Sequence, residues 1–391
     1  MITPEAHALS DLVRDLHQQG IPWQPAGLGS RLDWGPPVAA DLCSISTAAL
    51  VGVVEHNPGD FTITVRAGTP LEALQAELAV HRQWLALDPA WGAGDSSIGG
   101  LVARGLSGGY RLRHLGVRDQ LIGIALLRAD GIAARAGGRV VKNVAGYDLM
   151  RLFCGSWGSL GLITELTLRT QPLPRQRLGL LVQGDVNTLA DVAARLLASS
   201  LTPERIDHAS AGLAAAAGQA AAPSLLIGLA SLDAASLHEQ AIAIDQLSPL
   251  PVQRLEDGDR QRLVGVLNGS GVTATWLLRL GVPARRAAEL LSEPALAGLP
   301  VQLAAGDGLG MAWAQAGDPL TAVDVAAIRH RCQELGGWLT LLRQPAGSGL
   351  QAWNDAPSRP LIEAIKRQFD PLLQLAPGRL PGVAPQSVSS R

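Results

Sequence analysis

The chain has 391 residues and a mass of 40.8 kDa, a length that predicts two or three domains. Its 32 basic residues (Lys and Arg) and 34 acidic residues (Asp and Glu) give a formal net charge of −2, which excludes a basic footprint for nucleic acid. Hydrophobic residues make up 47% of the chain and charged residues 17%, which excludes a disordered composition.

Signals for metal binding, export and membrane insertion are weak. The three cysteines, Cys43, Cys154 and Cys332, form no CxxC pair and are too few to ligate an iron–sulfur cluster alone. The eight histidines occur in no HxH, HxxxH or HExxH pattern, so we expect no metal site. Aliphatic runs are much shorter than a membrane span, and the first residues include no hydrophobic signal region. We therefore expect a cytoplasmic protein, peripheral to a membrane only through a partner.

The N-terminal part is predicted to alternate strands and helices. Apolar residues at helical spacing between residues 3 and 20 predict a first helix. We expect strands over residues 42–45 and 61–65, a helix over residues 47–55 between them, and another helix over residues 71–81. This β-α-β order predicts a small mixed or parallel sheet.

Glycine becomes dense from residue 88 to residue 170, where β-rich segments replace helical periodicity. Asp130-Gly131 is a strong hairpin signal between the first two of these segments. Strands are expected over residues 121–128, 132–136 and 162–168. The proline-containing run over residues 171–174 marks a boundary.

The middle of the chain, from residue 177 to about residue 343, contains two similar successions of strands and helices. Thr321 and Asp324 form a cap pair for the last of these helices. Two halves of β-α-β type predict an antiparallel sheet with helices on one side, and the whole chain is therefore assigned to the α+β class.

Three glycine-rich stretches are the candidates for ligand binding: residues 25–35, 96–119 and 142–165. The sequence has no GxGxxG after its first strand, no P-loop and no GxSxG motif. Closely spaced glycines let successive backbone N–H groups converge on an anion such as a pyrophosphate. Taken alone, each stretch is more simply explained as an ordinary turn or connection.

Together and in this order, the stretches resemble the FAD-binding domain of the vanillyl-alcohol oxidase family, the PCMH-type flavoproteins. The run KNVAGYDL…GSWGSLGLITE, residues 142–165, is most similar to the E subunits of glycolate oxidases (glycolate dehydrogenases). Residues 365–379 resemble the closing motif of the hydroxyacid-oxidising branch. The resemblance implies a PCMH-type FAD-binding domain of two α/β subdomains and a cap domain built on an antiparallel sheet with helices on one side.

The same resemblance implies where the domains lie. The FAD-binding domain would span residues 1–175, with subdomains of about 1–68 and 69–175. A cap or substrate-type domain would span residues 176–350. Residues 351–391 would return to the FAD-binding domain and finish in a disordered end.

The resemblance also implies the contacts with FAD. The pyrophosphate loop, whose usual glycine triplet is interrupted by Leu28, would consist of Gly27, Gly29 and Ser30. The diphosphate and flavin ring would be lined by Ser97, Ile98, Gly99 and Gly100, a wall continued by Ser107 and Gly108. The adenosine end would lie near Ile163 and Glu165, and Arg379 would lie beside the flavin. No histidine occurs in the first loop, so we expect non-covalent FAD.

The middle domain departs from the pattern of the sister hydroxyacid dehydrogenases. Residues 303–311 are similar to their HAGDGNxH-like run, but Ala304 and Met311 stand where ligating histidines would be expected. Trp338 stands where the resembling subunits prefer histidine. Asp307 remains as a candidate proton acceptor, against the simpler interpretation of a turn aspartate. The catalytic residues are therefore unknown.

Three functions are open. The first is an FAD-binding subunit of a multi-subunit glycolate oxidase, which oxidises glycolate, a 2-hydroxy acid, to glyoxylate and passes electrons to a partner. The resemblance implies a larger FAD-binding subunit and an iron–sulfur subunit as partners. The second is a self-sufficient FAD-dependent dehydrogenase of the D-lactate type, and the third a non-catalytic flavin-binding scaffold. The missing histidines favour the first and third, and the nearly intact flavin motifs favour the first.

Overall fold

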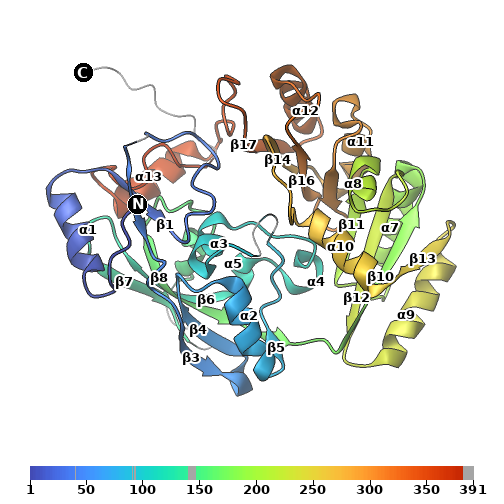
Figure 1. Ribbon diagram of the computed structural model, residues 1–391, viewed down its shortest axis with the longest axis horizontal. Helices are drawn as coiled ribbons and strands as arrows, with labels where there is room; N and C mark the ends of the chain where they lie inside the picture. The colour runs from blue at the N-terminus through green and yellow to red at the C-terminus, as the bar shows by residue number, and fades with distance from the viewer. Residues whose placement is uncertain (40, 90, 92–93, 140–146, 382–391) are drawn as a thin grey trace. The chain divides into compact units, whose positions relative to one another are not determined.

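The computed structural model describes residues 1–381 apart from residues 40, 90, 92–93 and 140–146. The chain divides into two compact units, whose elements are labelled in Figure 1. Unit 1 comprises Met1–Ser107, Leu115–Leu173 and Trp353–Arg391, and unit 2 comprises Gly108–His114 and Pro174–Ala352. Both combine helices with mainly antiparallel sheets, which confirms the α+β class. The expected disordered end lies outside the described residues, and the domain limits at residues 175 and 350 stay a prediction.

The main sheet of unit 1 has five antiparallel strands in the order β3-β4-β8-β6-β7. They are β3 (Val53–Asn57), β4 (Thr62–Arg66), β6 (Leu121–Leu127), β7 (Ala133–Gly137) and β8 (Leu162–Arg169). Strands β6 and β7 form the hairpin expected at Asp130-Gly131, where Gly131 adopts φ +76°. The expected subdomains 1–68 and 69–175 share this sheet, because Ile63 and Val65 of β4 join the same apolar core as Leu166 and Leu168 of β8.

The expected helix over residues 47–55 does not form. The chain instead turns at Gly52, with φ +106°, and continues as β3, whose Val53 pairs with Val65. Valine at positions 51, 53 and 54 favours an extended chain, and β4 supplies the hydrogen-bond partners that an extended backbone needs. Two small sheets complete unit 1: parallel β1 (Trp23–Ala26) with β2 (Cys43–Ser46), and antiparallel β5 (Gln83–Trp84) with β9 (Gln171–Pro172).

Helices cover the apolar faces of unit 1. The longer helices are α1 (Leu9–Gln18), α2 (Leu71–Val80), α3 (Ile98–Arg104) and α13 (Arg359–Phe369). The short elements are η1 (Pro58–Asp60), α5 (Val117–Gln120) and α6 (Met150–Phe153). Helix α13 packs on α6 through an edge-on contact of Phe369 with Phe153, whose ring centroids are 5.4 Å apart. The described part of the C-terminal segment is therefore part of unit 1.

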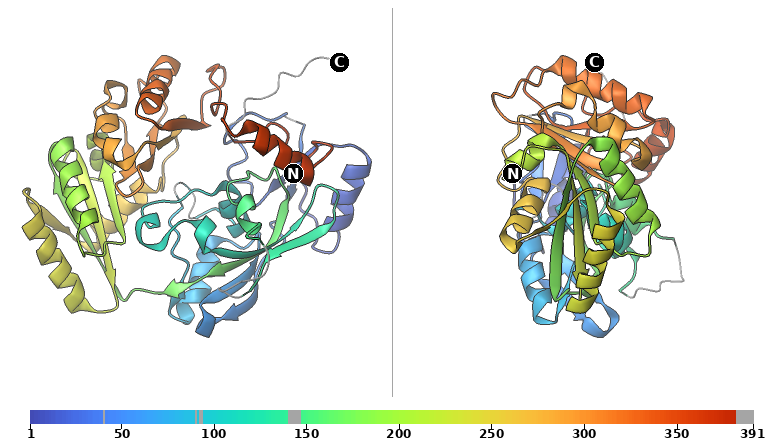
Figure 2. Two further views of the ribbon diagram at one scale, coloured as in Figure 1. Left: turned by 180° about the vertical axis from the view of Figure 1, so that it is seen from behind. Right: turned by 90° about the vertical axis from the view of Figure 1, so that its right-hand side faces the viewer.

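Unit 2 is built on one eight-stranded antiparallel sheet in the order β13-β10-β12-β11-β15-β16-β14-β17. The sheet is coloured from green to orange in Figure 2. Its strands are β10 (Gln176–Gln183), β11 (Arg205–Ala209), β12 (Ser224–Ser231), β13 (Val252–Leu255), β14 (Trp276–Gly281), β15 (Val301–Ala304), β16 (Leu309–Ala314) and β17 (Trp338–Arg343). The two halves expected from the sequence meet where β11 pairs with β15. One continuous sheet therefore carries both halves.

The helices of unit 2 lie mainly on one face of this sheet. They are α4 (Arg111–His114), α7 (Val186–Ala198), α8 (Ala211–Ala216), α9 (Ala234–Leu247), α10 (Asp257–Leu267), η2 (Ala284–Arg286), α11 (Ala287–Leu291), η3 (Pro294–Leu296) and α12 (Ala322–Glu334). The predicted cap pair of α12 is confirmed, because Thr321 and Asp324 bond each other's backbone N–H groups at 2.9 and 3.2 Å. Helix α10 is on the opposite face from α7 and α9, since its Arg260 packs over Gly179.

Candidate functional site

A cavity in unit 1 lies where three glycine-rich segments meet. Its walls are the loop over residues 24–34, the region of α3 over residues 96–106, and residues 157–163 that lead into β8. Arg379 joins them from the C-terminal segment. The empty space between these walls, including the part open to solvent, is about 980 Å³.

The cavity brings together most of the residues assigned to FAD from the sequence. Those that line it are Gly27, Gly29, Ser30, Ser97, Gly99, Gly100, Ile163 and Arg379. Three others lie elsewhere: Ile98 is 1% exposed in the apolar core, Gly108 belongs to unit 2, and Ser107 is the residue before it. Glu165 also lies apart from the cavity walls. The contacts of all these residues with FAD stay a prediction.

Glycine permits the close approach of the cavity walls. A Cβ on Gly27 would lie 2.1 Å from Ser97 Oγ, so the first loop can pack against α3 only without a side chain there. A Cβ on Gly99 would lie 2.9 Å from the carbonyl oxygen of Ala67. Gly29 adopts φ +79°, a conformation that supplies the turn after Leu28. Although Leu28 interrupts the triplet, glycine remains at position 27, where a side chain would clash with Ser97, and at position 29, where φ is positive.

Three arginines converge on the same cavity. Arg31 and Arg104 line it together with Arg379, and the Nη2 group of Arg104 donates to the carbonyl oxygen of Arg31. Burial, the charge of Arg379 and the charge of Arg31 lower the pKa of Arg104 to about 9. Guanidinium groups gathered in this way form a site suited to an anion.

Tryptophan rings hold the Arg104 guanidinium in place. Its central carbon lies 4.4 Å from the ring centre of Trp157 and 5.2 Å from that of Trp34. The Trp157 ring also contacts Trp353 edge-on, with centroids 4.9 Å apart. Stacking on indole faces stabilises a cation and restricts its rotation.

Arg31, Arg104, Trp34 and Trp157 were not predicted as site residues. Arg31 and Trp34 lie inside the first glycine-rich stretch, and Arg104 follows Gly99-Gly100 by about one helical turn. A long cationic side chain next to a predicted phosphate loop was the signal that could have indicated them. Their convergence depends on contacts between segments that are far apart in the chain.

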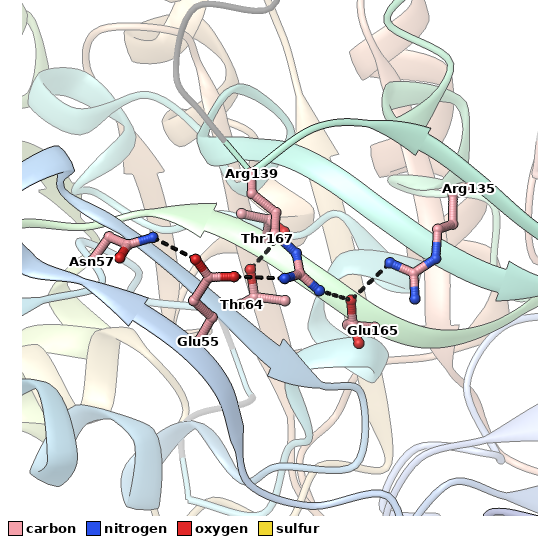
Figure 3. A network of polar contacts seen from close by, with 7 residues as sticks. All are labelled: Glu55, Asn57, Thr64, Arg135, Arg139, Glu165 and Thr167. Atoms are coloured by element: carbon pink, nitrogen blue, oxygen red, sulfur yellow. Dashed lines mark hydrogen bonds and ion pairs between the residues drawn. The ribbon is translucent and has the colours of Figure 1, made fainter.

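Glu165 lies on the outer face of the five-stranded sheet, in the polar network of Figure 3. Arg135 and Arg139 donate to its carboxylate at 3.2 and 3.4 Å, and Arg139 also donates to Glu55 at 2.6 Å. Ile163 and Glu165 would share one face of a regular strand, but a register shift at this point of β8 inserts one extra residue against β6. The bulge sends Ile163 to the core and Glu165 to the outer face.

The sheet of unit 2 carries the run that resembles the HAGDGNxH pattern. Ala304 ends β15, Met311 lies in β16 opposite Gln302, and both side chains are buried. Asp307 lies in the turn between these strands, where it accepts the Leu309 N–H at 3.0 Å and pairs with Arg111 at 3.0 Å. Burial raises the pKa of Asp307. These contacts are those of a turn aspartate.

A buried polar cluster lies beside this turn and was not predicted. Arg205 donates to Asp207 at 2.5 Å, and Gln302 donates to the other carboxylate oxygen of Asp207 at 2.6 Å. The Tyr110 ring lies 5.6 Å from the Arg205 guanidinium, and a Cβ on Gly109 would lie 2.5 Å from Asp207. Residues 108–114 are therefore held on the sheet of unit 2, although they belong to the second glycine-rich stretch.

In the part of the chain that the structure describes, no group of three His, Cys, Asp or Glu side chains could hold a metal ion. No helix among the same residues is long and apolar enough to cross a membrane.

Comparison with known families identifies the cavity's unit. Residues 3–137 match the family model of the FAD-binding domain. This chain carries an FAD-binding domain of the PCMH type. The flavoprotein therefore binds FAD, and the glycine-walled, arginine-lined cavity fits a cofactor with a diphosphate, because small residues leave room for it and the cations compensate its charge.

The flavoprotein is similar to curated enzymes and enzyme subunits. It is 36% identical over 175 residues to glycolate oxidase subunit GlcE of Escherichia coli K12, a match covering 45% of this chain and 49% of that protein. It is 29% identical over 203 residues to a probable mitochondrial D-lactate dehydrogenase of Danio rerio, covering 51% of this chain and 40% of that protein. The chain thus spans about half the length of the curated relatives it matches, or less.

The flavoprotein is also similar to a second glycolate oxidase subunit and to a solved synthase structure. Glycolate oxidase subunit GlcD of Bacillus subtilis is 30% identical over 202 residues, covering 51% of this chain and 42% of that protein. A solved alkyldihydroxyacetonephosphate synthase structure matches 95% of this chain and 74% of its own, with a TM-score of 0.69 and 15% identity. At that identity the structure supports the fold alone.

Proposed function

We propose that this flavoprotein is the FAD-binding subunit of a multi-subunit glycolate oxidase or dehydrogenase. The complex would oxidise glycolate, a 2-hydroxy acid, to glyoxylate and pass the electrons to a partner subunit. The observation that carries this proposal is the 36% identity to GlcE over 175 residues. The similarity to GlcD and to D-lactate dehydrogenases supports the wider class of FAD-dependent 2-hydroxy acid oxidation.

The residues of the cavity would bind and orient FAD, without a covalent bond. The first loop, residues 24–35, contains no histidine for covalent attachment. Gly27, Gly29 and Ser30 would hold the diphosphate, with Gly99 and Gly100 on the facing wall. When bound, FAD supplies the two-electron acceptor for oxidation of a C–H bond next to a hydroxyl. The chain's own contribution is to hold the cofactor, to place it and to exclude water.

Partner subunits would be needed to accept the electrons from the flavin. A chain with three cysteines cannot supply the four ligands of an iron–sulfur cluster alone, and Cys332 is fully buried with a pKa raised to about 12 by burial. We therefore propose a larger FAD-binding subunit and an iron–sulfur subunit as partners. The complex would be cytoplasmic, or peripheral to the membrane through a partner.

A self-sufficient dehydrogenase of the D-lactate type is the second candidate. It is favoured by the D-lactate dehydrogenases among the relatives. Against it, Ala304 and Met311 offer no hard metal ligand, and Asp307 is engaged with Arg111 and the turn backbone. A flavin-binding scaffold without turnover of its own is the third candidate, favoured by the same residues.

An anaerobic visible spectrum separates the three candidates. The full chain would be purified alone and together with candidate partner subunits, and glycolate or D-lactate would be added without oxygen. The proposal predicts a flavin spectrum that bleaches with glycolate only in the presence of partners. Bleaching of the isolated chain would establish the self-sufficient dehydrogenase. A flavin that stays oxidised in both samples would contradict the proposed reaction and favour the scaffold.

A further inference from the structure

The three arginines of the FAD cavity differ in how their N–H groups are used. Arg31 donates to the carbonyl oxygen of Trp91 at 2.5 Å, to Ser30 Oγ at 2.5 Å and to Ser96 Oγ at 2.8 Å. Its second terminal nitrogen donates to Asp95 at 2.6 Å. The Arg31 guanidinium is thus engaged by the protein itself, and it ties the first loop to the segment before α3.

Arg379 is engaged in the same way. Its two terminal nitrogens donate to the carbonyl oxygens of Trp34 and Leu32. The residue is 4% exposed, and burial lowers its pKa. Arg379 therefore ties the C-terminal segment to the first loop, a bracing role that needs no ligand.

Arg104 is only partly engaged. Its Nη2 group donates to the carbonyl oxygen of Arg31, which fixes the guanidinium at the end of the first loop. Its Nη1 group is buried and has no hydrogen-bond partner within the described residues. A buried donor without a partner destabilises the structure, and more so when it is charged. Stacking between Trp34 and Trp157 prevents the side chain from turning away toward water.

We infer that Arg104 Nη1 donates to a phosphate oxygen of the FAD diphosphate. The bond to Arg31 places the guanidinium next to the loop of Gly27, Gly29 and Ser30, where the diphosphate is proposed to bind. Arg31 and Arg379 add positive charge nearby, and each of their terminal nitrogens already has a hydrogen-bond partner within the protein. The diphosphate is the charged group of FAD, and it accepts charge-assisted hydrogen bonds from arginine. Arg104 would then be the side-chain anchor of the cofactor.

This inference rests on the proposed position of FAD in the cavity, and its test is a binding experiment. The apo form of the full chain would be titrated calorimetrically with FAD, ADP and riboflavin, for the wild type and for Arg104→Met. Methionine keeps an unbranched side chain between the indoles but removes the charge and the donors. We expect Kd for FAD and ADP to rise at least roughly tenfold, and Kd for riboflavin, which has no phosphate, to stay within about twofold.

Controls separate anchoring from folding. Arg135→Met removes a 68% exposed arginine of the outer-face network and should leave all three affinities unchanged. Arg104→Lys keeps the charge without the planar fork and should give an intermediate Kd. Thermal unfolding of each apo protein, followed by circular dichroism, shows whether the fold is intact. If Arg104→Met unfolds, an unchanged Kd for FAD in Arg104→Lys would overturn the inference.

The results that would overturn the role of Arg104 differ from those that would overturn the proposed position of FAD or the proposed reaction. An equal loss for riboflavin and FAD would overturn the inference, because the guanidinium would then face the flavin ring. Unchanged affinities for FAD and ADP in Arg104→Met would also overturn it. The position of FAD is tested separately by Gly27→Ala, which blocks contact of the first loop with Ser97. A wild type that binds FAD but leaves glycolate unoxidised with its partners would contradict only the proposed reaction.

Discussion

The Lys366 ammonium lies 2.6 Å from the Asp370 carboxylate, and the two side chains are 5% and 0% exposed. Lys366 also donates to the carbonyl oxygens of Ser159 at 2.7 Å and Leu375 at 2.6 Å. Asp370 in turn accepts the backbone N–H groups of Gln374 and Leu375. The ion pair is therefore fully hydrogen-bonded, and it fixes the chain after α13 against the segment that leads into β8.

Lys366→Met is expected to destabilise unit 1 strongly. The substitution leaves Asp370 buried without its counter-charge, which typically costs 3–5 kcal/mol. Urea unfolding followed by tryptophan fluorescence would measure the loss. The neighbouring exposed Arg367→Met is the matched control and should change the free energy of unfolding by less than about 0.5 kcal/mol. Equal stability of the two variants would show that the ion pair contributes little.

Gly27→Ala is expected to release FAD. The added Cβ would lie 2.1 Å from Ser97 Oγ, so the first loop must move away from α3 and the cavity must change shape. The ratio of flavin absorbance to protein absorbance after gel filtration measures the occupancy. Ser97→Gly removes the obstructing hydroxyl and keeps a residue that is tolerated at a helix N-cap. The double variant should therefore regain flavin, and its failure to do so would place the effect elsewhere.

Gly109→Ala is expected to destabilise unit 2. Its Cβ would lie 2.5 Å from Asp207 Oδ2 and 2.9 Å from Arg205 Nε, two atoms of a buried, hydrogen-bonded cluster that cannot easily move. Overpacking of this kind costs about 1–3 kcal/mol. Gly258→Ala is the control, because a Cβ there meets nothing within 4 Å and alanine favours the helix α10. A drop in Tm for both variants alike would contradict the packing argument.

His208 is expected to make unit 2 sensitive to acid. Burial lowers the pKa of His208 from 6.5 to about 4, so the unfolded chain binds a proton between these pH values and the folded chain does not. The contribution of the neutral His208 to the free energy of unfolding is present above pH 6.5 and is lost as the pH falls toward 4. At one pKa unit per 1.36 kcal/mol, the loss between pH 7.5 and pH 5 is about 2 kcal/mol.

Urea unfolding at the two pH values would measure this loss. His208→Gln should reduce the pH dependence by that amount, because glutamine does not titrate. The exposed His238→Gln should keep the wild-type pH dependence. An unchanged dependence in His208→Gln would mean that another group binds the proton on unfolding.

Local chemistry was enough to predict several parts of this protein. The Asp130-Gly131 hairpin and the Thr321–Asp324 cap form as predicted, since a turn and a cap depend on residues close together in the chain. The glycine spacing of the first two stretches predicted the walls of the cavity, because a backbone that approaches a ligand or another wall leaves no room for a side chain. The resemblance carried by these stretches also predicted FAD.

Tertiary structure decided what depends on distant segments. The strand at residues 53–57 replaced the expected helix because β4 offered it a partner. One extra residue in β8 turned Glu165 away from Ile163, a change that follows from pairing with β6. Arg104 meets Arg31 and Trp157 only when three segments fold together, so its position as a candidate anchor is set by long-range packing. The sequence by itself determined the cofactor class, and the fold selected the side chains that line the cavity.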